Sequence, residues 1–442
     1  MKSLLHKFHH YKNIILRDKD YYELIHGISL SAFFMIGGIC ISYGVTILSA
    51  RWFGADGMGL MAMINTLIVF AWAIAGLGAQ WSVIRYINER KAQWVAWRIR
   101  SFHRYIIRVI LPFSIMIWIL LYLIRGWLAN TVFGEPDLEQ LIMYLAFSFP
   151  LIVLGEIWLV ILKWHKDLKS YHSIDKIGKM LLHLAIIFLV RTTSQSILGP
   201  ALALIISSAS MAIIAAPRLR KWHKELPTIQ TISNYQILKT SLPMMITSIS
   251  FIIMNQTDIV MLGISMNSEQ VGIYQVAYRL AALVPFGLLI VNMIMAQKIA
   301  QLYYSWEKEK LKRILEIWAW VSTSIWVIAT LMFVLFAKQR MGIFGEEFIT
   351  WTLLLQVLCG GQLINASAGS VWYYLNMTWR EKILQRTVII TAILNIALNT
   401  LLIPYYGALW AAIASAICLA CWNVYMVRYI WKEDKVRTFI GG

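Results

Sequence analysis

The sequence predicts an all-α polytopic membrane protein with twelve transmembrane helices, divided into two halves of six. Three observations predict this fold class: an apolar composition, long runs without charge, and basic residues that recur in alternate connecting segments. Of the 442 residues, 59% are hydrophobic and only 14% are charged, whereas soluble domains carry about 25% charged residues. Much of this chain is therefore expected to face lipid rather than water.

The apolar residues come in blocks long enough to cross a bilayer. Residues 28–50 and 57–84 contain no Asp, Glu, Lys or Arg, and residues 387–427 form a third charge-free run. A bilayer core needs roughly 20 apolar residues per helix, and backbone in hydrocarbon must satisfy its own hydrogen bonds. The expected spans are 28–50, 59–82, 106–124, 139–162, 177–190, 197–217, 241–264, 276–297, 315–337, 350–373, 387–403 and 407–427.

The basic residues alternate between the two sides of these spans. Seven segments on one side, both terminal tails included, hold 32 Lys and Arg, whereas the six segments on the other side hold five. Basic residues are retained in cytoplasmic loops, so the split predicts an even number of spans with both termini in the cytoplasm. The first span follows a charged tail and is long enough to cross the membrane, which predicts an uncleaved first helix.

The same boundaries divide the chain into five parts. A basic cytoplasmic tail (1–27) precedes the first half (28–217), and a basic linker (218–240) leads to the second half (241–427) and a cytoplasmic tail (428–442). Within the first half, residues 85–105 interleave basic side chains with Trp94 and Trp97. That pattern suits a helix lying at the headgroup surface, and it suits an ordinary connecting helix equally well.

A faint internal repeat relates the halves. Gly59 and Gly272 lie 213 positions apart, and each is expected to open the next helix behind an acidic residue, Asp56 or Glu269. Since each half has an even number of spans, the halves share one orientation. Two such parallel repeats are related by an axis along the membrane normal, with a site between them.

Several function classes are disfavoured by composition and motifs. The net charge of +18 would suggest nucleic acid in a soluble protein, but here it sets topology, so no nucleic-acid partner is expected. The four cysteines lie inside apolar spans and are expected to be packing residues rather than metal ligands. No catalytic constellation or phosphate-binding Gly-x-x-x-x-Gly-Lys-Ser/Thr loop occurs. We therefore expect no enzyme, no cofactor, no metal and no direct use of ATP.

Three segments carry a family resemblance. They are residues 51–60 (Arg-Trp-Phe-Gly-Ala-Asp-Gly-Met-Gly-Leu), residues 258–279, and most specifically residues 393–415, which include Asn395, Asn399, Pro404 and Gly407. They resemble the O-antigen (Wzx-like) and related oligosaccharide flippases, the polysaccharide-export branch of the MOP superfamily that also contains the MATE drug exporters. Trp410 stands where that family commonly has glycine. The related lipid II flippases would carry two additional helices.

The resemblance implies more than the residues themselves establish. It implies two six-helix lobes around a central cavity, as in MATE proteins, in the inner membrane of a bacterium. It also implies a cargo, an oligosaccharide on polyprenyl (pyro)phosphate, moved from the cytoplasmic to the outer leaflet for O-antigen, capsule or exopolysaccharide assembly. The expected partners are this lipid-linked cargo, membrane lipids, H⁺ or Na⁺ as coupling ion, and the polysaccharide polymerase and chain-length machinery.

Charged residues inside spans are the candidate site, because each costs about 2.5–3.5 kcal/mol at a helix centre unless it is paired or hydrated. Asp258 and Arg279 lie at similar depth on successive spans and are expected to be able to pair. Arg279, Lys179 and, at the rim, Arg51 would attract phosphates and sugar acids, because guanidinium binds phosphate oxygens bidentately. Asp258 or Glu156 would take up the coupling ion, assisted by His183.

Other interpretations of these residues and of the chain stay open. The charged residues equally suit structural ion pairs, and the long side chain of Lys179 equally suits a position that reaches to the interface. Uncharged polar residues in the spans would bond sugars or join helices; they are Asn65, Asn255, Gln256, Asn292, Asn365, Asn395 and Asn399. The main alternative function is a MATE-like cation or drug antiporter. A membrane-embedded glycan polymerase or ligase would need a long outward loop, which the predicted topology does not provide.

Overall fold

The computed structural model describes residues 19–78, 105–164, 167–223, 233–286, 307–378 and 380–436, with isolated positions between 292 and 305 and at 438. Within these ranges every regular element is helical. The predicted tail residues 1–18, the Trp-containing segment 85–104 and linker residues 224–232 lie outside the described residues. So does most of the predicted span 276–297 beyond residue 286.

The first half of the chain forms long helices joined by short turns of wider π-helical geometry. The elements are α2 (Lys19–Ala75), η2 (Ile106–Ile110), α5 (Leu111–Gly126), η3 (Trp127–Val132), α6 (Asp137–Trp164), α7 (Leu168–His172), η4 (Ser173–Gly178), α8 (Lys179–Thr193) and α9 (Gly199–His223).

The second half repeats this helical pattern with more breaks. Its elements are α10 (Asn234–Ser265), α11 (Ser268–Ala281), α13 (Lys308–Leu335), α14 (Ala337–Gly342), α15 (Glu346–Ile349), α16 (Thr352–Ser367), α17 (Val371–Met377), α18 (Glu381–Tyr406) and α19 (Ala408–Asp434).

The expected all-α membrane fold is confirmed. Eight of the described helices are long and apolar enough to cross a membrane. The expected spans 28–50 and 59–82 fall on one element, α2, in which Gly54 leaves helical geometry with φ of 69°. Glycine adopts positive φ without steric cost, which explains how the chain breaks between these two spans. The count of twelve spans and the orientation in the membrane stay predictions.

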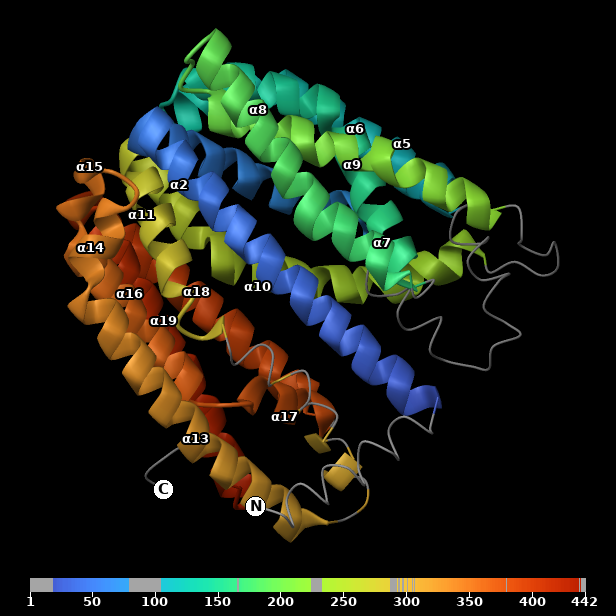
Figure 1. The fold of residues 1–442 in the computed structure, drawn as a ribbon, viewed down its shortest axis with the longest axis vertical. Coiled ribbons are helices and arrows are strands. Elements are labelled where there is room, and N and C mark those ends of the chain that lie inside the picture. The colour runs from blue at the N-terminus through green and yellow to red at the C-terminus, as the bar shows by residue number, and fades with distance from the viewer. Residues whose placement is uncertain are drawn as a thin grey trace, which may run out of the picture.

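The helices form two groups that meet at one end of the molecule and diverge toward the other (Figure 1). α5, α6, α8 and α9 pack with α2 in the first group, and α13, α16, α18 and α19 pack with one another in the second. Among the described helices, the most extensive packing joins α2, in the first half of the chain, to α11, in the second half. The end of the molecule at which α14, α15 and the start of α11 lie is called the joined end below.

The buried core also connects the two halves of the chain. One apolar cluster includes Met58 and Ile64 of α2, Ala277 of α11 and Leu355 of α16, so it crosses between the halves. A second cluster, which includes Leu311, Leu375 and Met426, draws its residues from the second half of the chain. The halves therefore share a core at the joined end, whereas the second half also has a core of its own.

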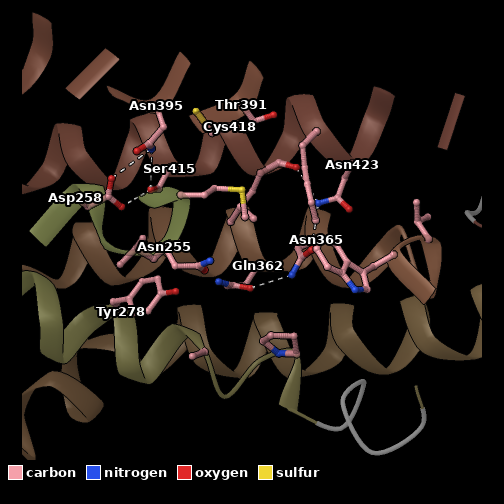
Figure 2. Close-up of a pocket in the computed structure, with 18 of the residues that line it drawn as sticks. Asn255, Asp258, Tyr278, Gln362, Asn365, Thr391, Asn395, Ser415, Cys418 and Asn423 are labelled. Atoms are coloured by element: carbon pink, nitrogen blue, oxygen red, sulfur yellow. Dashed lines mark hydrogen bonds between the residues drawn. The ribbon is translucent and has the colours of Figure 1, made fainter. Parts of the chain in front are cut away.

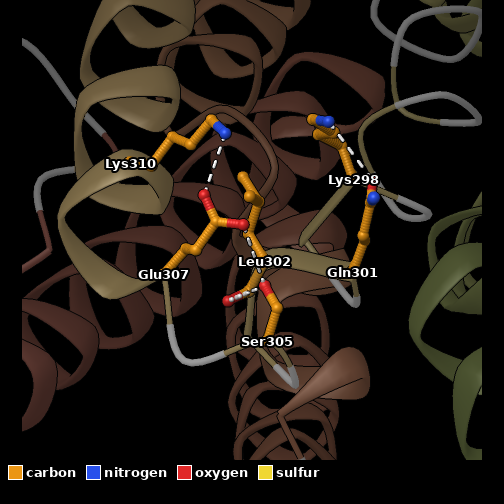
Figure 3. Close-up of polar contacts among 6 residues, drawn as sticks. All are labelled: Lys298, Gln301, Leu302, Ser305, Glu307 and Lys310. Atoms are coloured by element: carbon orange, nitrogen blue, oxygen red, sulfur yellow. Dashed lines mark hydrogen bonds and ion pairs between the residues drawn. The ribbon is translucent and has the colours of Figure 1, made fainter.

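The turn that leads into α13 is polar, as expected for a loop in water. Lys310 Nζ donates to Glu307 Oε2 at 2.8 Å, Ser305 Oγ donates to Glu307 Oε1 at 3.4 Å, and Lys298 Nζ donates to Gln301 Oε1 at 3.2 Å (Figure 3). The hydrogen bond from Lys310 lowers the pKa of the Glu307 carboxyl.

The position of this turn tests the predicted topology. In a variant whose four native cysteines are replaced, Lys310→Cys is expected to resist a membrane-impermeant maleimide in intact cells and to react after permeabilisation. Ser194→Cys, in the exposed turn after α8, is expected to react in intact cells, because its segment carries few basic residues. Labelling of Lys310→Cys from outside would overturn the orientation and the span count together.

Candidate functional site

A buried carboxylate lies at the centre of the second half. Asp258 on α10 is 5% exposed. Asn399 Nδ2 on α18 donates to Asp258 Oδ1 at 2.7 Å, and Asn395 Nδ2, one turn earlier, donates to it at 3.4 Å. The hydroxyls of Tyr274 on α11 and Ser415 on α19 both donate to Asp258 Oδ2. Four helices thus converge on one carboxylate. Figure 2 shows Asp258 with two of its partners, Asn395 and Ser415.

The described residues give Asp258 no cationic partner. The expected possibility of an ion pair with Arg279 is not realised. Arg279 Nη1 instead donates to Thr46 Oγ1 on α2 at 2.6 Å, and the Tyr43 hydroxyl donates to the Arg279 carbonyl. The reason is the packing: α11 lies against α2 and turns Arg279 toward the first half, whereas Asp258 faces α18 and α19. A buried carboxylate held by neutral donors favours a proton or a small cation.

Glu156 and Lys179 are brought together in the first half. Lys179 Nζ on α8 lies 3.4 Å from Glu156 Oε1 on α6, with side chains 16% and 33% exposed. An ion pair between two helices was one of the interpretations that the sequence left open. Both side chains keep some accessibility to solvent, so the pair is not sealed in the protein interior.

Removing either partner of this pair is expected to destabilise the protein modestly. Glu156→Gln and Lys179→Gln should each lower the thermal unfolding midpoint, and the double variant should lose less than the sum. A coupling of about 1 kcal/mol suits a partly exposed pair. Unfolding midpoints of the purified protein and its three variants in one detergent measure this, and strictly additive losses would contradict the interaction.

Of the remaining two candidates, only Arg51 lies apart from these groups. His183, one turn after Lys179, is 3% exposed and lies close enough to Arg279 and Lys179 to interact electrostatically with both. Its Nε2 has no hydrogen-bond partner among the described residues. Arg51 is at the joined end, where its Nε donates to the Ile343 carbonyl at 2.7 Å. The structure therefore does not gather the six predicted site residues into one cluster.

A cavity of about 490 Å³ extends from Asp258 through the second half of the chain. Its polar lining is dominated by neutral amides and also includes Tyr278, Thr391 and Ser415 (Figure 2). Sequence reasoning anticipated Asn255, Asn292, Asn365 and Asn395 as polar residues in spans. It missed the cavity residues Gln362, Asn423, Trp372, Trp422 and Ser415, and the Tyr274 hydroxyl that bonds Asp258. The i,i+4 spacing of Asn395 and Asn399 was the available signal, because it puts two amides on one helix face.

At the joined end, each half hydrogen-bonds a helix start of the other. Glu347, in α15, accepts from the Ala55 N–H at 2.9 Å, where α2 resumes after Gly54. Glu135 accepts from the Ser268 N–H at 2.6 Å, at the start of α11. Ala55 and Ser268 are 213 positions apart, the interval that separates Gly59 from Gly272. The accepting glutamates are 212 positions apart, so the two contacts correspond to within one residue under the internal repeat. Carboxylates at helix N-termini are favourable.

Two glycines allow this contact. A Cβ on Gly59 would lie 1.8 Å from the Ser268 carbonyl oxygen, and a Cβ on Gly272 would lie 1.8 Å from the Ala55 carbonyl oxygen. Small residues at helix crossings let backbones approach closely in membrane proteins. The sequence repeat therefore identified the crossing point of the two halves.

The fold and this arrangement define a polytopic membrane transporter of two helical halves. Comparison with known proteins identifies the family within this class. Residues 24–297 match the family model of the polysaccharide biosynthesis proteins, so the chain belongs to that family and the resemblance predicted from sequence is confirmed. A stretch of 174 residues is 24% identical to a protein named probable low-salt glycan biosynthesis flippase Agl15, from Haloferax volcanii. That match covers 39% of this chain and 37% of the length of the relative.

Solved structures share the fold at low sequence identity. The lipid II flippase MurJ, in an inward closed conformation, superposes with a TM-score of 0.73 at 16% identity, over 91% of this chain and 87% of that one. A multidrug-resistance MATE transporter of the MOP superfamily, in an inward-facing conformation, superposes with a TM-score of 0.69 at 13% identity. That match covers 90% of this chain and 94% of the transporter. These matches establish the MOP transporter fold.

Proposed function

We propose that this protein is a flippase for oligosaccharides linked to polyprenyl (pyro)phosphate, moving them from the cytoplasmic to the outer leaflet of a bacterial inner membrane. Membership of the polysaccharide biosynthesis family is the observation that carries the proposal. The flippase names of a relative and of a solved structure with the same fold support it. The protein acts as a carrier rather than as a catalyst of bond chemistry, and both termini lie in the cytoplasm.

Transport proceeds by alternating access. Repeat-built transporters hold their cargo between two halves that rock around it. The joined end carries Arg51, Glu135 and Ser268, which belong to segments that the basic-residue distribution predicts to be outside. The described conformation is therefore closed toward the outside, and cargo would enter from the cytoplasm. Arg279 and Lys179 are proposed to attract the cargo's phosphates, with Arg51 at the outer rim.

Asp258 is proposed to couple export to an ion gradient. Its oxygens gather hydroxyl and amide groups from α11, α18 and α19 without a cation among the described residues. The Asp258 carboxylate and the hydroxyl oxygens of Tyr274 and Ser415 are groups that suit a proton or a hard cation such as Na⁺. Glu156, already paired with Lys179, and buried His183 are secondary candidates. A surface-polysaccharide polymerase and its chain-length machinery would receive the exported cargo.

Deletion of the gene tests the proposal directly. In a strain without a redundant flippase, surface polysaccharide should disappear while its lipid-linked repeat unit accumulates on the cytoplasmic side. Re-expression of the protein should restore both. Normal surface glycan in the deleted strain would defeat the proposal, whereas loss of glycan without accumulation would indicate a step before export.

A second candidate function is a MATE-like antiporter of cationic compounds. Asp258, which has no cationic partner in the part of the chain that the structure describes, lies in a cavity with aromatic walls, and a cationic compound could neutralise it there. This function predicts increased drug sensitivity of the deletion strain with unchanged surface glycan. The phenotype of the deletion strain therefore distinguishes the two functions, and family membership favours the glycan flippase.

A further inference from the structure

The cavity in the second half has two chemically different ends. One end is Asp258 with its donors. The other is a chain of amides, in which Asn423 Nδ2 on α19 donates to Asn365 Oδ1 at 3.2 Å and Asn365 Nδ2 on α16 donates to Gln362 Oε1 at 3.4 Å. Asn292 also lines the cavity, and its Oδ1 accepts from Ser370 Oγ at 2.5 Å.

No lysine or arginine lines this cavity among the described residues, and Asp258 is its one carboxylate. The cationic candidates Arg279 and Lys179 lie outside its lining, against α2 and α6. A phosphate or an acidic sugar would thus find no counter-charge here. Side-chain amides both donate and accept hydrogen bonds, which matches hydroxyl and acetamido groups.

Two indole rings complete the amide end. Trp372 of α17 and Trp422 of α19 lie with ring centroids 5.5 Å apart at an interplanar angle of 38°, and both line the cavity. Flat apolar faces beside a few placed polar groups are the usual composition of a small-molecule site, and the volume lies in the typical range of roughly 300–1,000 Å³. The C–H face of a pyranose ring is apolar, whereas its rim carries hydroxyls.

We propose that this cavity binds an uncharged sugar residue of the cargo, bearing hydroxyl or acetamido groups, separately from the site that receives the phosphates. The inference rests on the proposed flippase function and adds a substrate class to it: the sugar nearest this cavity is neutral. Gln362, Asn365 and Asn423 form hydrogen bonds with the hydroxyl or acetamido groups of the sugar. Trp372 and Trp422 cover its apolar face.

The sugar site and the ion site share a side chain. Asn395 lines the cavity and donates through Nδ2 to Asp258 Oδ1, while its Oδ1 accepts from Asn399 Nδ2 at 3.1 Å. When a sugar accepts a hydrogen bond from the Asn395 amide, Asp258 loses that hydrogen-bond donor. When Asp258 is neutralised, it holds the Asn395 amide less strongly, and the amide is free to bind the sugar. Sugar affinity and ion occupancy are therefore linked, and linkage of this kind is reciprocal.

Binding measurements on the purified full-length protein in lipid nanodiscs test the proposal with three probes. The probes are undecaprenyl pyrophosphate, the same lipid bearing N-acetylglucosamine, and the same lipid bearing glucuronic acid. The neutral sugar is expected to tighten binding about tenfold over the sugarless lipid, as a few net hydrogen bonds would, and glucuronic acid is expected to add nothing. Asn365→Leu and Asn423→Leu should abolish the gain and leave affinity for undecaprenyl pyrophosphate unchanged.

Thr400→Val is the matched control, because Thr400 is exposed on α18 and its hydroxyl donates a hydrogen bond to the Ile396 carbonyl of the same helix. It should retain the full gain, and Gln362→Met replaces either leucine variant if that variant fails to fold. Equal binding of the sugarless and N-acetylglucosaminyl lipids, or tighter binding of the glucuronic acid form, would overturn the sugar site and leave the flippase intact. Failure to bind any of the three lipids would overturn both.

Discussion

Gly272→Ala and Gly59→Ala are each expected to reduce glycan export by more than tenfold, although each adds a single methyl group. The added Cβ would meet a backbone carbonyl oxygen of the other helix at 1.8 Å, and backbone cannot move aside as a flexible side chain can. Overpacking commonly costs about 1–3 kcal/mol. Here the cost falls on the conformation in which α2 and α11 are in contact, so the outside-closed population should fall.

The neighbouring hydrogen bonds make this loss visible. Separation of α2 from α11 also lengthens the contacts of Glu347 with the Ala55 N–H and of Glu135 with the Ser268 N–H. A cysteine pair at Asp56 and Ser268, whose side chains now bond at 2.7 Å, should cross-link readily in a variant lacking the native cysteines. The same pair should cross-link poorly once Gly272→Ala is added.

Gly360→Ala and Gly44→Ala are the matched controls. Both glycines are in helices, and a Cβ at either position meets nothing within 4 Å. Alanine has the higher helix propensity, so these variants should keep export and gain slightly in stability. Full export by Gly272→Ala with unchanged cross-linking would show that the close crossing is not needed for transport.

Asp258→Asn is expected to abolish gradient-driven export, by roughly 100-fold, while cargo binding persists. Asparagine preserves the side-chain size but cannot alternate between a charged and a neutral form, so an ion no longer has differential affinity for the two conformations. Coupling free energies between sites typically correspond to factors of about 5–150. Export from membrane vesicles, with and without an imposed proton or sodium gradient, measures the effect.

Asp137→Asn is the matched control, because Asp137 is an exposed aspartate in the first turn of α6. It should behave as the unmodified protein. If Asp258→Asn exports normally and still responds to the gradient, the coupling group lies elsewhere, and Glu156→Gln becomes the next variant to examine. If the variant exports normally but ignores the gradient, Asp258 couples transport without being required for it.

The sequence predicted the fold class because hydrophobic length is a local property. A block such as residues 387–427 can cross lipid wherever the rest of the chain lies, so composition alone identified the helices. The residues of the candidate site were partly predictable for the same reason: Asp258, Glu156 and Lys179 are costly in a span and therefore conspicuous. Gly59 and Gly272 were found as a repeat before their contact was known.

The partners of those residues could not be predicted in the same way. Asp258 and Arg279 lie at similar depth on successive spans, and depth alone suggested that they can pair. Depth does not determine how a helix is rotated about its axis. Because α11 packs on α2, Arg279 donates a hydrogen bond to Thr46 instead. The reciprocal contacts of Glu135 and Glu347 were missed because no local pattern marks a carboxylate that bonds another half's helix.

The sequence by itself determined that this protein crosses a membrane many times, and it predicted that the basic segments lie on one side and that the halves are related. Each of these follows from local transfer free energies and from spacing along one chain. Only the tertiary structure decided that Asp258 has neutral partners, that the amides of α16 and α19 share one cavity, and that two glycines meet at the joined end. Such contacts depend on how helices rotate and cross, which is set by packing among segments far apart in the chain.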